Sequence, residues 1–172
     1  MTLPTARAAK RDLIGNILVI GLPMLGGRVF QARVWPMQLP ELPAVLVYGW
    51  QETKTRRTLD AWTHQFEVEC AMALEGMVQA PTGPEVEDGM EALAGDIEYA
   101  ILTSPLLLGL TGSIERIDRV ETKLQARADA EMVQGTVSMA FHLVWTEIHQ
   151  VVVPRNEPTT DFGIKSTSTI FR

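Results

Sequence analysis

The chain has 172 residues, of which 46% are apolar and 21% are charged, and its formal net charge at pH 7 is −6. This length suits one compact domain, and the composition excludes an intrinsically disordered chain, which would be poorer in apolar residues. The acidic balance argues against general binding of nucleic acids, because the release of phosphate counterions requires a positive surface.

The first quarter of the chain predicts a helix, a strand and a loop. Apolar residues recur at spacings of three and four over residues 5–20, which predicts a helix that Gly21 and Pro23 end. Residues 28–35 predict a strand. Residues 36–43 contain three prolines and predict an extended loop.

The next segment predicts two strands separated by a polar stretch. The continuous apolar run at residues 44–48 predicts a central strand that is covered on both faces. Residues 52–60 are polar and predict a solvated loop or hairpin tip. Residues 62–74 alternate between apolar and polar side chains, which predicts a half-buried strand. Cys70 lies on its apolar side and is expected to be buried, whereas His64 is expected at its exposed end.

The second half of the chain predicts a helix followed by a hairpin. After a loop at residues 79–84, residues 85–102 place their apolar side chains on one stripe, which predicts the second helix. Residues 113–126 carry charges of alternating sign and predict a strand with one wet face. Residues 132–149 give the longest strand signal, and the short polar segment at 127–131 predicts an antiparallel hairpin.

The last residues differ in character from the rest of the chain. Residues 154–172 are rich in Ser, Thr and Pro and contain too few apolar side chains to form a core. They predict an extended C-terminal arm that becomes ordered only by contact with a partner. The sequence therefore predicts an α+β fold with one domain over residues 1–153. In that domain two helices pack on one face of a mostly antiparallel sheet of about five strands.

The residues that carry chemistry form no recognisable catalytic, cofactor-binding or metal-binding pattern. His64, His142 and His149 lack the spacing of a zinc motif, and the single cysteine, Cys70, cannot form an intrachain disulfide. The sequence contains neither a GxSxG motif nor a phosphate-binding glycine loop. The carboxylates of residues 85–96 are typical of a solvated helix face. We expect no enzymatic activity, no cofactor and no metal.

The apolar stretch of residues 13–25 is interrupted by Gly15, Asn16, Gly21 and Pro23. It is too short to span a bilayer, and no small-residue cleavage site follows it. The sequence therefore predicts synthesis in the cytoplasm and no membrane partner.

Three groups of side chains are candidates for contact with a partner. Trp35, Trp50 and Trp62 flank the apolar run at 44–48, where they are either interface anchors or part of the core. A basic cluster lies in the polar stretch at 52–60, and the arm carries four large apolar side chains. The candidate interface residues are Trp35, Trp50, Lys54, Arg56, Arg57, Phe162, Ile164, Ile170 and Phe171.

One stretch carries a family resemblance. Residues 27–52 read GRVFQARVWPMQLPELPAVLVYGWQE: an "RVF…RVWP" strand, a Pro-rich loop and "LPAVLVY" leading to a polar turn. This pattern resembles the tail terminators, a family of minor tail proteins of long-tailed bacteriophages. The order of predicted elements over residues 5–150 agrees with that family. The resemblance rests on structural motifs and includes no catalytic motif.

The resemblance implies a structural virion protein at the head-proximal end of the tail, made in the host cytoplasm. Its copies would form a homohexameric ring through heterologous contacts. The ring would stop polymerisation of the tail-tube protein and give the head-tail connector or neck proteins a docking surface. DNA would pass through the ring without binding it tightly.

Two alternatives stay open at this point. The chain could have another role at the head-tail junction, as a tail completion, neck or tube protein. It could also be an enzyme or a module that binds a small ligand, which would require a polar cluster in a cleft. The sequence offers no candidate residues for such a cluster.

Overall fold

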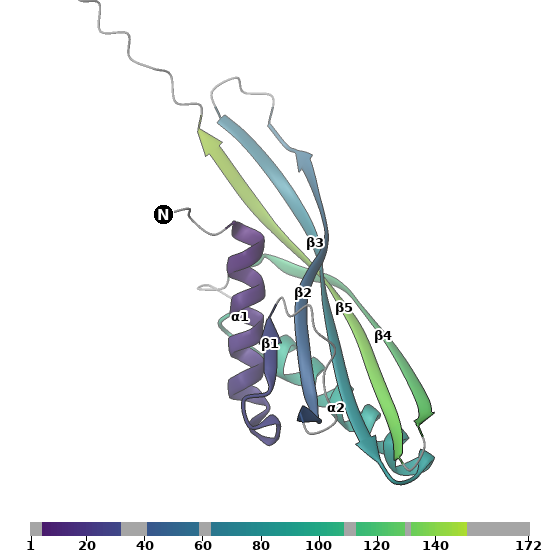
Figure 1. The fold of residues 1–172 in the computed structure, drawn as a ribbon. Helices are drawn as coiled ribbons and strands as arrows, with labels where there is room; N and C mark the ends of the chain where they lie inside the picture. The colour runs from purple at the N-terminus through teal and green to yellow at the C-terminus, as the bar shows by residue number, and fades with distance from the viewer. Residues whose placement is uncertain (1–4, 32–40, 59–62, 109–112, 130–131, 151–172) are drawn as a thin grey trace, which may run out of the picture.

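The computed structural model describes residues 5–31, 41–58, 63–108, 113–129 and 132–150. These residues form two α-helices, a short 3-10 helix and one five-stranded sheet (Figure 1). The elements in chain order are α1 (Ala6–Gly21), η1 (Pro23–Leu25), β1 (Val29–Gln31), β2 (Ala44–Arg56), β3 (Thr63–Ala80), α2 (Gly83–Leu102), β4 (Arg116–Asp129) and β5 (Met132–Gln150).

The sheet confirms the predicted α+β class. Its strand order is β1-β2-β3-β5-β4, with β1 parallel to β2 and every other pair antiparallel. The parallel pair was not anticipated from the sequence. The predicted hairpin of the last two strands is confirmed, since β4 and β5 pair from Asp129↔Met132 up to Arg116↔Val144.

Both helices begin at a threonine cap. The Thr5 side chain accepts a hydrogen bond from the Ala8 amide at 3.2 Å, and this bond satisfies one of the free N–H groups of the first turn of α1. Thr82 caps α2 in the same way and its hydroxyl donates to the Glu85 carboxylate at 2.9 Å. These local signals are the reason that both helices lie within two residues of their predicted bounds.

Two glycines bring α2 directly onto the sheet. A Cβ atom added at Gly76 of β3 would lie 2.8 Å from a methyl group of Leu93. One added at Gly135 of β5 would lie 2.6 Å from Met90 and 2.7 Å from Val86. A larger residue at either position would push the helix away, so these glycines set the distance between the two layers.

Both helices cover the same face of the sheet, and the core lies between them and it. Inward-facing side chains of β3 and β5 are opposite one another, as at Met72↔Phe141 and Leu74↔Met139. Cys70 is fully buried in this row, as predicted. Burial and the nearby Glu52 carboxylate raise the pKa of the Cys70 thiol to about 11. At neutral pH the thiol is therefore protonated and a poor nucleophile.

The loop or hairpin tip predicted at residues 52–60 is wrong for its first five residues. Residues 52–56 are not a loop, because β2 continues to Arg56 in register with β3 up to Arg56↔Phe66. This end of the sheet extends beyond the helices (Figure 1), so its side chains need not be apolar on either face. The run at residues 44–48 is covered on one face only, since Leu46 is half-buried and Tyr48 is exposed.

Several predicted features fall outside the described residues. These are the second half of the strand predicted at 28–35, the loop at 36–40, Trp35, Trp62, the domain boundary at residue 153 and the arm of residues 154–172.

Candidate assembly surfaces

The predicted basic cluster is largely engaged within the subunit. Lys54 Nζ lies 2.6 Å from a Glu147 carboxylate oxygen and 3.4 Å from Glu52. Arg57 donates to the Glu67 carboxylate. Arg56 is exposed at the end of β2. The structure therefore places the three cations in a surface of mixed charge.

Glu147 of β5 is the centre of a small polar network on the helix-covered face. Its carboxylate accepts hydrogen bonds from Lys54, from Trp145 Nε1 at 3.0 Å and from His149, whose Nε2 lies 3.3 Å away. Burial raises the pKa of Glu147, but these bonds and the Lys54 charge outweigh it and the pKa is lowered overall. The hydrogen bond to Glu147 raises the pKa of Lys54, so both groups are charged at neutral pH.

Lys10 connects α1 to the same region. Its ammonium lies 4.5 Å above the centre of the Trp145 ring, within the range of a cation–π contact. Burial lowers the pKa of Lys10, while the charge of Glu147 opposes that change. This cluster therefore holds α1 against the end of β5 and is internal to the subunit.

The face of the sheet opposite the helices, here called the open face, carries an exposed aromatic pair. Trp50 is 70% exposed and Tyr48 is 39% exposed. The register between β2 and β3 shifts between Gly49 and Gln51, so Trp50 is the extra residue of a bulge and lies on the same face as Tyr48. The sequence left open whether the tryptophans are interface anchors or part of the core. Trp50 is not part of the core.

The aromatic pair borders a hollow of about 500 Å3, here called the open-face groove. Its floor is formed by Ala73 of β3 with Ala140 and Ser138 of β5, all of them small. The register aligns Tyr48, Ala73, Ala140 and Glu121 in one row across four strands. Large side chains at the ends of the row and small ones in the middle produce the groove.

The two walls of the groove are polar as well as aromatic. The Tyr48 hydroxyl lies 3.4 Å from Glu75, and burial together with that carboxylate raises the pKa of Tyr48. On the β4 side Glu121 pairs with Arg119 at 2.9 Å. Lys123 lies next to Glu121 on this face and has no ion pair within the part of the chain that the structure describes.

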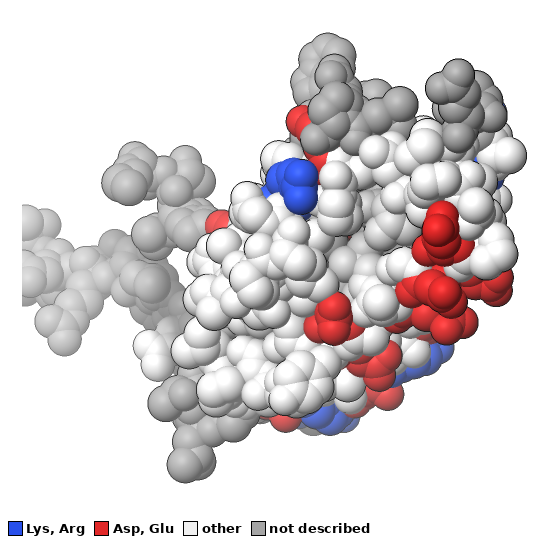
Figure 2. All heavy atoms as spheres, turned by 90° about the horizontal axis from the view of Figure 1, so that it is seen from below, with Lys and Arg blue, Asp and Glu red and all other residues white. Residues whose placement is uncertain are grey.

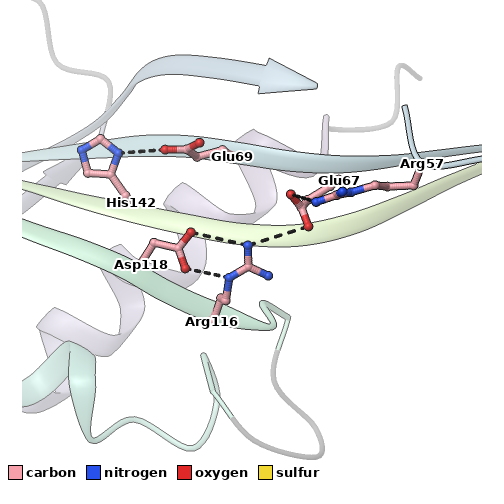
Figure 3. Close-up of polar contacts among 6 residues, drawn as sticks. All are labelled: Arg57, Glu67, Glu69, Arg116, Asp118 and His142. Atoms are coloured by element: carbon pink, nitrogen blue, oxygen red, sulfur yellow. Dashed lines mark hydrogen bonds and ion pairs between the residues drawn. The ribbon is translucent and has the colours of Figure 1, made fainter. Parts of the chain in front are cut away.

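Beyond the groove, toward the end of the sheet that the helices do not cover, the open face carries a set of ion pairs in two separate groups (Figure 3). We call this set the ion-paired region. It consists of Arg57, Glu67, Glu69, Arg116, Asp118 and His142.

The charged side chains of the ion-paired region cover an apolar side chain, Val144. Arg116 lies 2.7 Å from Asp118 and 3.7 Å from Glu67, while His142 lies 3.4 Å from Glu69. Val144 stands between Glu69 and Arg116 in the register and is only 1% exposed. The charged side chains on both sides therefore cover Val144 although no helix lies on this face.

A second exposed apolar surface lies where the two helices end, on the other side of the sheet. Ile20 is 73% exposed and Tyr99 is 72% exposed, and Leu106 stands beside them. These three residues border a hollow of about 310 Å3 and are here called the helix-end patch. A view from below shows a broad uncharged area next to a group of acidic side chains (Figure 2).

The exposed side of α2 is acidic. It contains no lysine or arginine, and its exposed carboxylates have no ion pair among the described residues. They are Glu85, Glu87, Asp88, Glu91, Asp96 and Glu98. Two such helices would repel each other, which disfavours a symmetric contact between the α2 helices of two copies.

Among the described residues no group of three His, Cys, Asp or Glu side chains is placed to hold a metal ion. In the same part of the chain no helix is both long and apolar enough to cross a membrane.

The comparisons with known proteins give a likeness among solved structures. No family model matches the chain, and neither does any curated protein. Among solved structures, a chain from a virion of a native gene transfer agent particle is similar at 13% identity and a TM-score of 0.40. The likeness covers 76% of this chain and 94% of that chain. A TM-score this low carries no argument about function, which must rest on the surfaces described above.

Proposed function

We propose that this chain is a structural virion protein whose copies assemble into a ring, and that the ring terminates a phage-type tail. The observation that carries the proposal is the pair of exposed apolar surfaces on different sides of the sheet. Contiguous exposed apolar surfaces are uncommon on proteins that act as isolated monomers, and they often mark sites where another protein binds.

The two surfaces lie on different sides of the subunit and differ from each other, so a neighbour that meets one of them would not present the same surface in return, and contact between copies would be heterologous. The open-face groove is hollow and bordered by Tyr48 and Trp50, whereas the helix-end patch projects Ile20 and Tyr99. A head-to-tail contact repeats from copy to copy and gives a closed ring or an open filament, depending on the rotation between copies. We infer a closed ring of six copies from the resemblance of residues 27–52 to tail terminators.

The ring would meet different partners on its two sides, the tail-tube protein on one and a connector or neck protein on the other. Lys54 lies beside the first turn of α1, whereas Arg56 and Arg57 lie at and just after the end of β2. All three are candidates for one of these contacts. Because Lys54 and Arg57 are already ion-paired, a partner docking there would face mixed charge and not a basic patch.

The test is the mass and shape of the purified full chain, measured by light scattering and negative-stain imaging, with and without tail-tube protein. We expect single rings of six copies that cap tube ends and stop their growth. A chain that stays monomeric even with tube protein would contradict the proposal. Long cylinders would favour a tube protein, and rings that leave tube growth unchanged would favour a neck or tail completion protein.

A further inference from the structure

The open-face groove has the features of a seat for an extended peptide. Its floor is small, its volume is about 500 Å3, and one wall is a tryptophan that is 70% exposed. An extended segment directs alternate side chains to the same side, about 7 Å apart, and so could place two large apolar side chains over Ala73 and Ala140.

The charges on the walls narrow the choice of occupant. Glu75 stands beside Tyr48 on one wall, and Glu121 and Lys123 stand on the other. An occupant with two apolar side chains and opposite charges at its two ends would match this rim. An occupant with several charges of one sign would not match it, because the rim carries charges of both signs.

Residues 161–165 of this chain have that composition. They read Asp-Phe-Gly-Ile-Lys, with Phe162 and Ile164 two positions apart, a glycine between them and opposite charges outside them. We propose that this segment of one copy occupies the open-face groove of a neighbouring copy. Phe162 and Ile164 fill the hollow, Asp161 lies near Lys123, and Lys165 lies near Glu121 or Glu75. The inference rests on the proposed ring assembly, since it requires a second copy.

The lengths favour a neighbour's groove over the chain's own. The described chain ends at Gln150 of β5, and the groove floor at Ala140 is ten residues back along the same strand, about 33 Å away. Phe162 is twelve residues beyond Gln150, a reach of about 40 Å if those residues are fully extended. Reversing direction uses several of those residues, so the remaining length is shorter than the distance back to the chain's own groove, which favours the groove of a neighbouring copy.

Cysteine pairing tests this seat directly. In the variant Ser138→Cys/Ile164→Cys, one thiol stands on the exposed floor of the groove and the other replaces one of the two apolar anchors. Cys70 is fully buried and can remain in place. After mild oxidation we expect covalent dimers and a ladder of higher species on a non-reducing gel, all removed by a reductant.

The matched controls are Glu91→Cys/Ile164→Cys, whose first thiol lies on exposed α2 across the sheet, and the single variant Ser138→Cys. Neither should give the ladder. A fast-migrating monomer with an internal crosslink would show that the segment occupies its own groove, and the inference about a neighbour would be wrong.

Light scattering of the reduced double variant separates the two proposals. Rings that form but give no crosslink would overturn the peptide seat and leave the ring intact. A protein that remains monomeric, with no crosslink, would overturn the ring and the seat together.

Discussion

The ion-paired region and the open-face groove are both centred on β3 and β5, but they differ in how the central side chains are covered. In the ion-paired region, Val144 lies between Glu69 and Arg116 and is buried beneath charged side chains that pair with one another. In the open-face groove, Ala73 and Ala140 lie in the equivalent central positions, and the bulky residues at the edges leave a hollow. The first region is closed by contacts within one subunit, whereas the second leaves a hollow of about 500 Å3.

The largest expected effect comes from removing the exposed wall of the groove. Trp50→Ala should weaken association by about 2–4 kcal/mol, roughly 30- to 700-fold, because exposed tryptophans at interfaces are common hot spots. The folded subunit should lose little stability, since Trp50 is mostly in water. Sedimentation over a dilution series measures the first effect and thermal unfolding the second.

Ile148→Ala is the control for this variant. Ile148 is also a large exposed apolar residue, but it lies near the far end of β5 and not in the groove. Equal losses of association for the two variants would remove the distinction between the regions.

A nearly equal effect is expected from deleting residues 154–172. The described elements end at Gln150, so the shortened subunit should fold and should lose association as Trp50→Ala does. Combining both changes should cost little more than either one, because they remove the same contact. Fully additive losses in a double-mutant cycle, read by sedimentation, would mean that arm and groove act separately.

In the ion-paired region the expected effect is on folding and not on assembly. Val144→Ala removes two buried methyl groups and should lower the free energy of unfolding by about 2 kcal/mol. Ring formation should be unchanged at temperatures where the variant is folded. Denaturant titration gives the first quantity, and a loss of rings without a loss of stability would contradict the assignment.

The smallest expected effect is on stability, and it comes from the Lys54–Glu147 contact on the helix-covered face of the sheet. Lys54→Met should lower the free energy of unfolding by about 1 kcal/mol at neutral pH, since it removes a charged hydrogen bond to Glu147. The folded pKa of Glu147 is lowered from 4.5, so its contribution is present above pH 4.5 and is lost as pH falls through the folded value. The folded pKa of Lys54 is raised from 10.5, so its contribution is complete below pH 10.5 and is lost only as pH rises through that raised value.

The difference in unfolding free energy between Lys54→Met and the unaltered chain should therefore be constant from about pH 6 to pH 10 and shrink below about pH 4. Thermal unfolding across this range provides the measurement. Arg127→Met, which is exposed and has no ion pair to lose among the described residues, is the control and should show no such pH dependence.

The helices could be predicted from the sequence because their signals are local. Thr5 and the spacing of apolar residues define α1 within one or two residues. The strands were less predictable where contacts distant in sequence decide their length. The strand predicted at residues 62–74 continues through Gly76 to Ala80, and Leu93 of α2 packs on that glycine.

The open-face groove could not be predicted for the same reason. Its floor joins Ala73 and Ala140, which meet only through the register of β3 and β5. The exposure of Trp50 depends on a bulge that no local pattern indicates. Likewise Lys54 was identified as a candidate, but its partner Glu147 is 93 positions away in the chain.

The pairing of β3 with β5 runs without interruption from Thr63↔Gln150 to Ala80↔Val133. A pull along these strands would load their hydrogen bonds in shear, so many bonds would share the force at once. Tension applied where the chain leaves β5 would pass along the whole sheet to the part that the helices cover. Each subunit should therefore resist extension along these two strands.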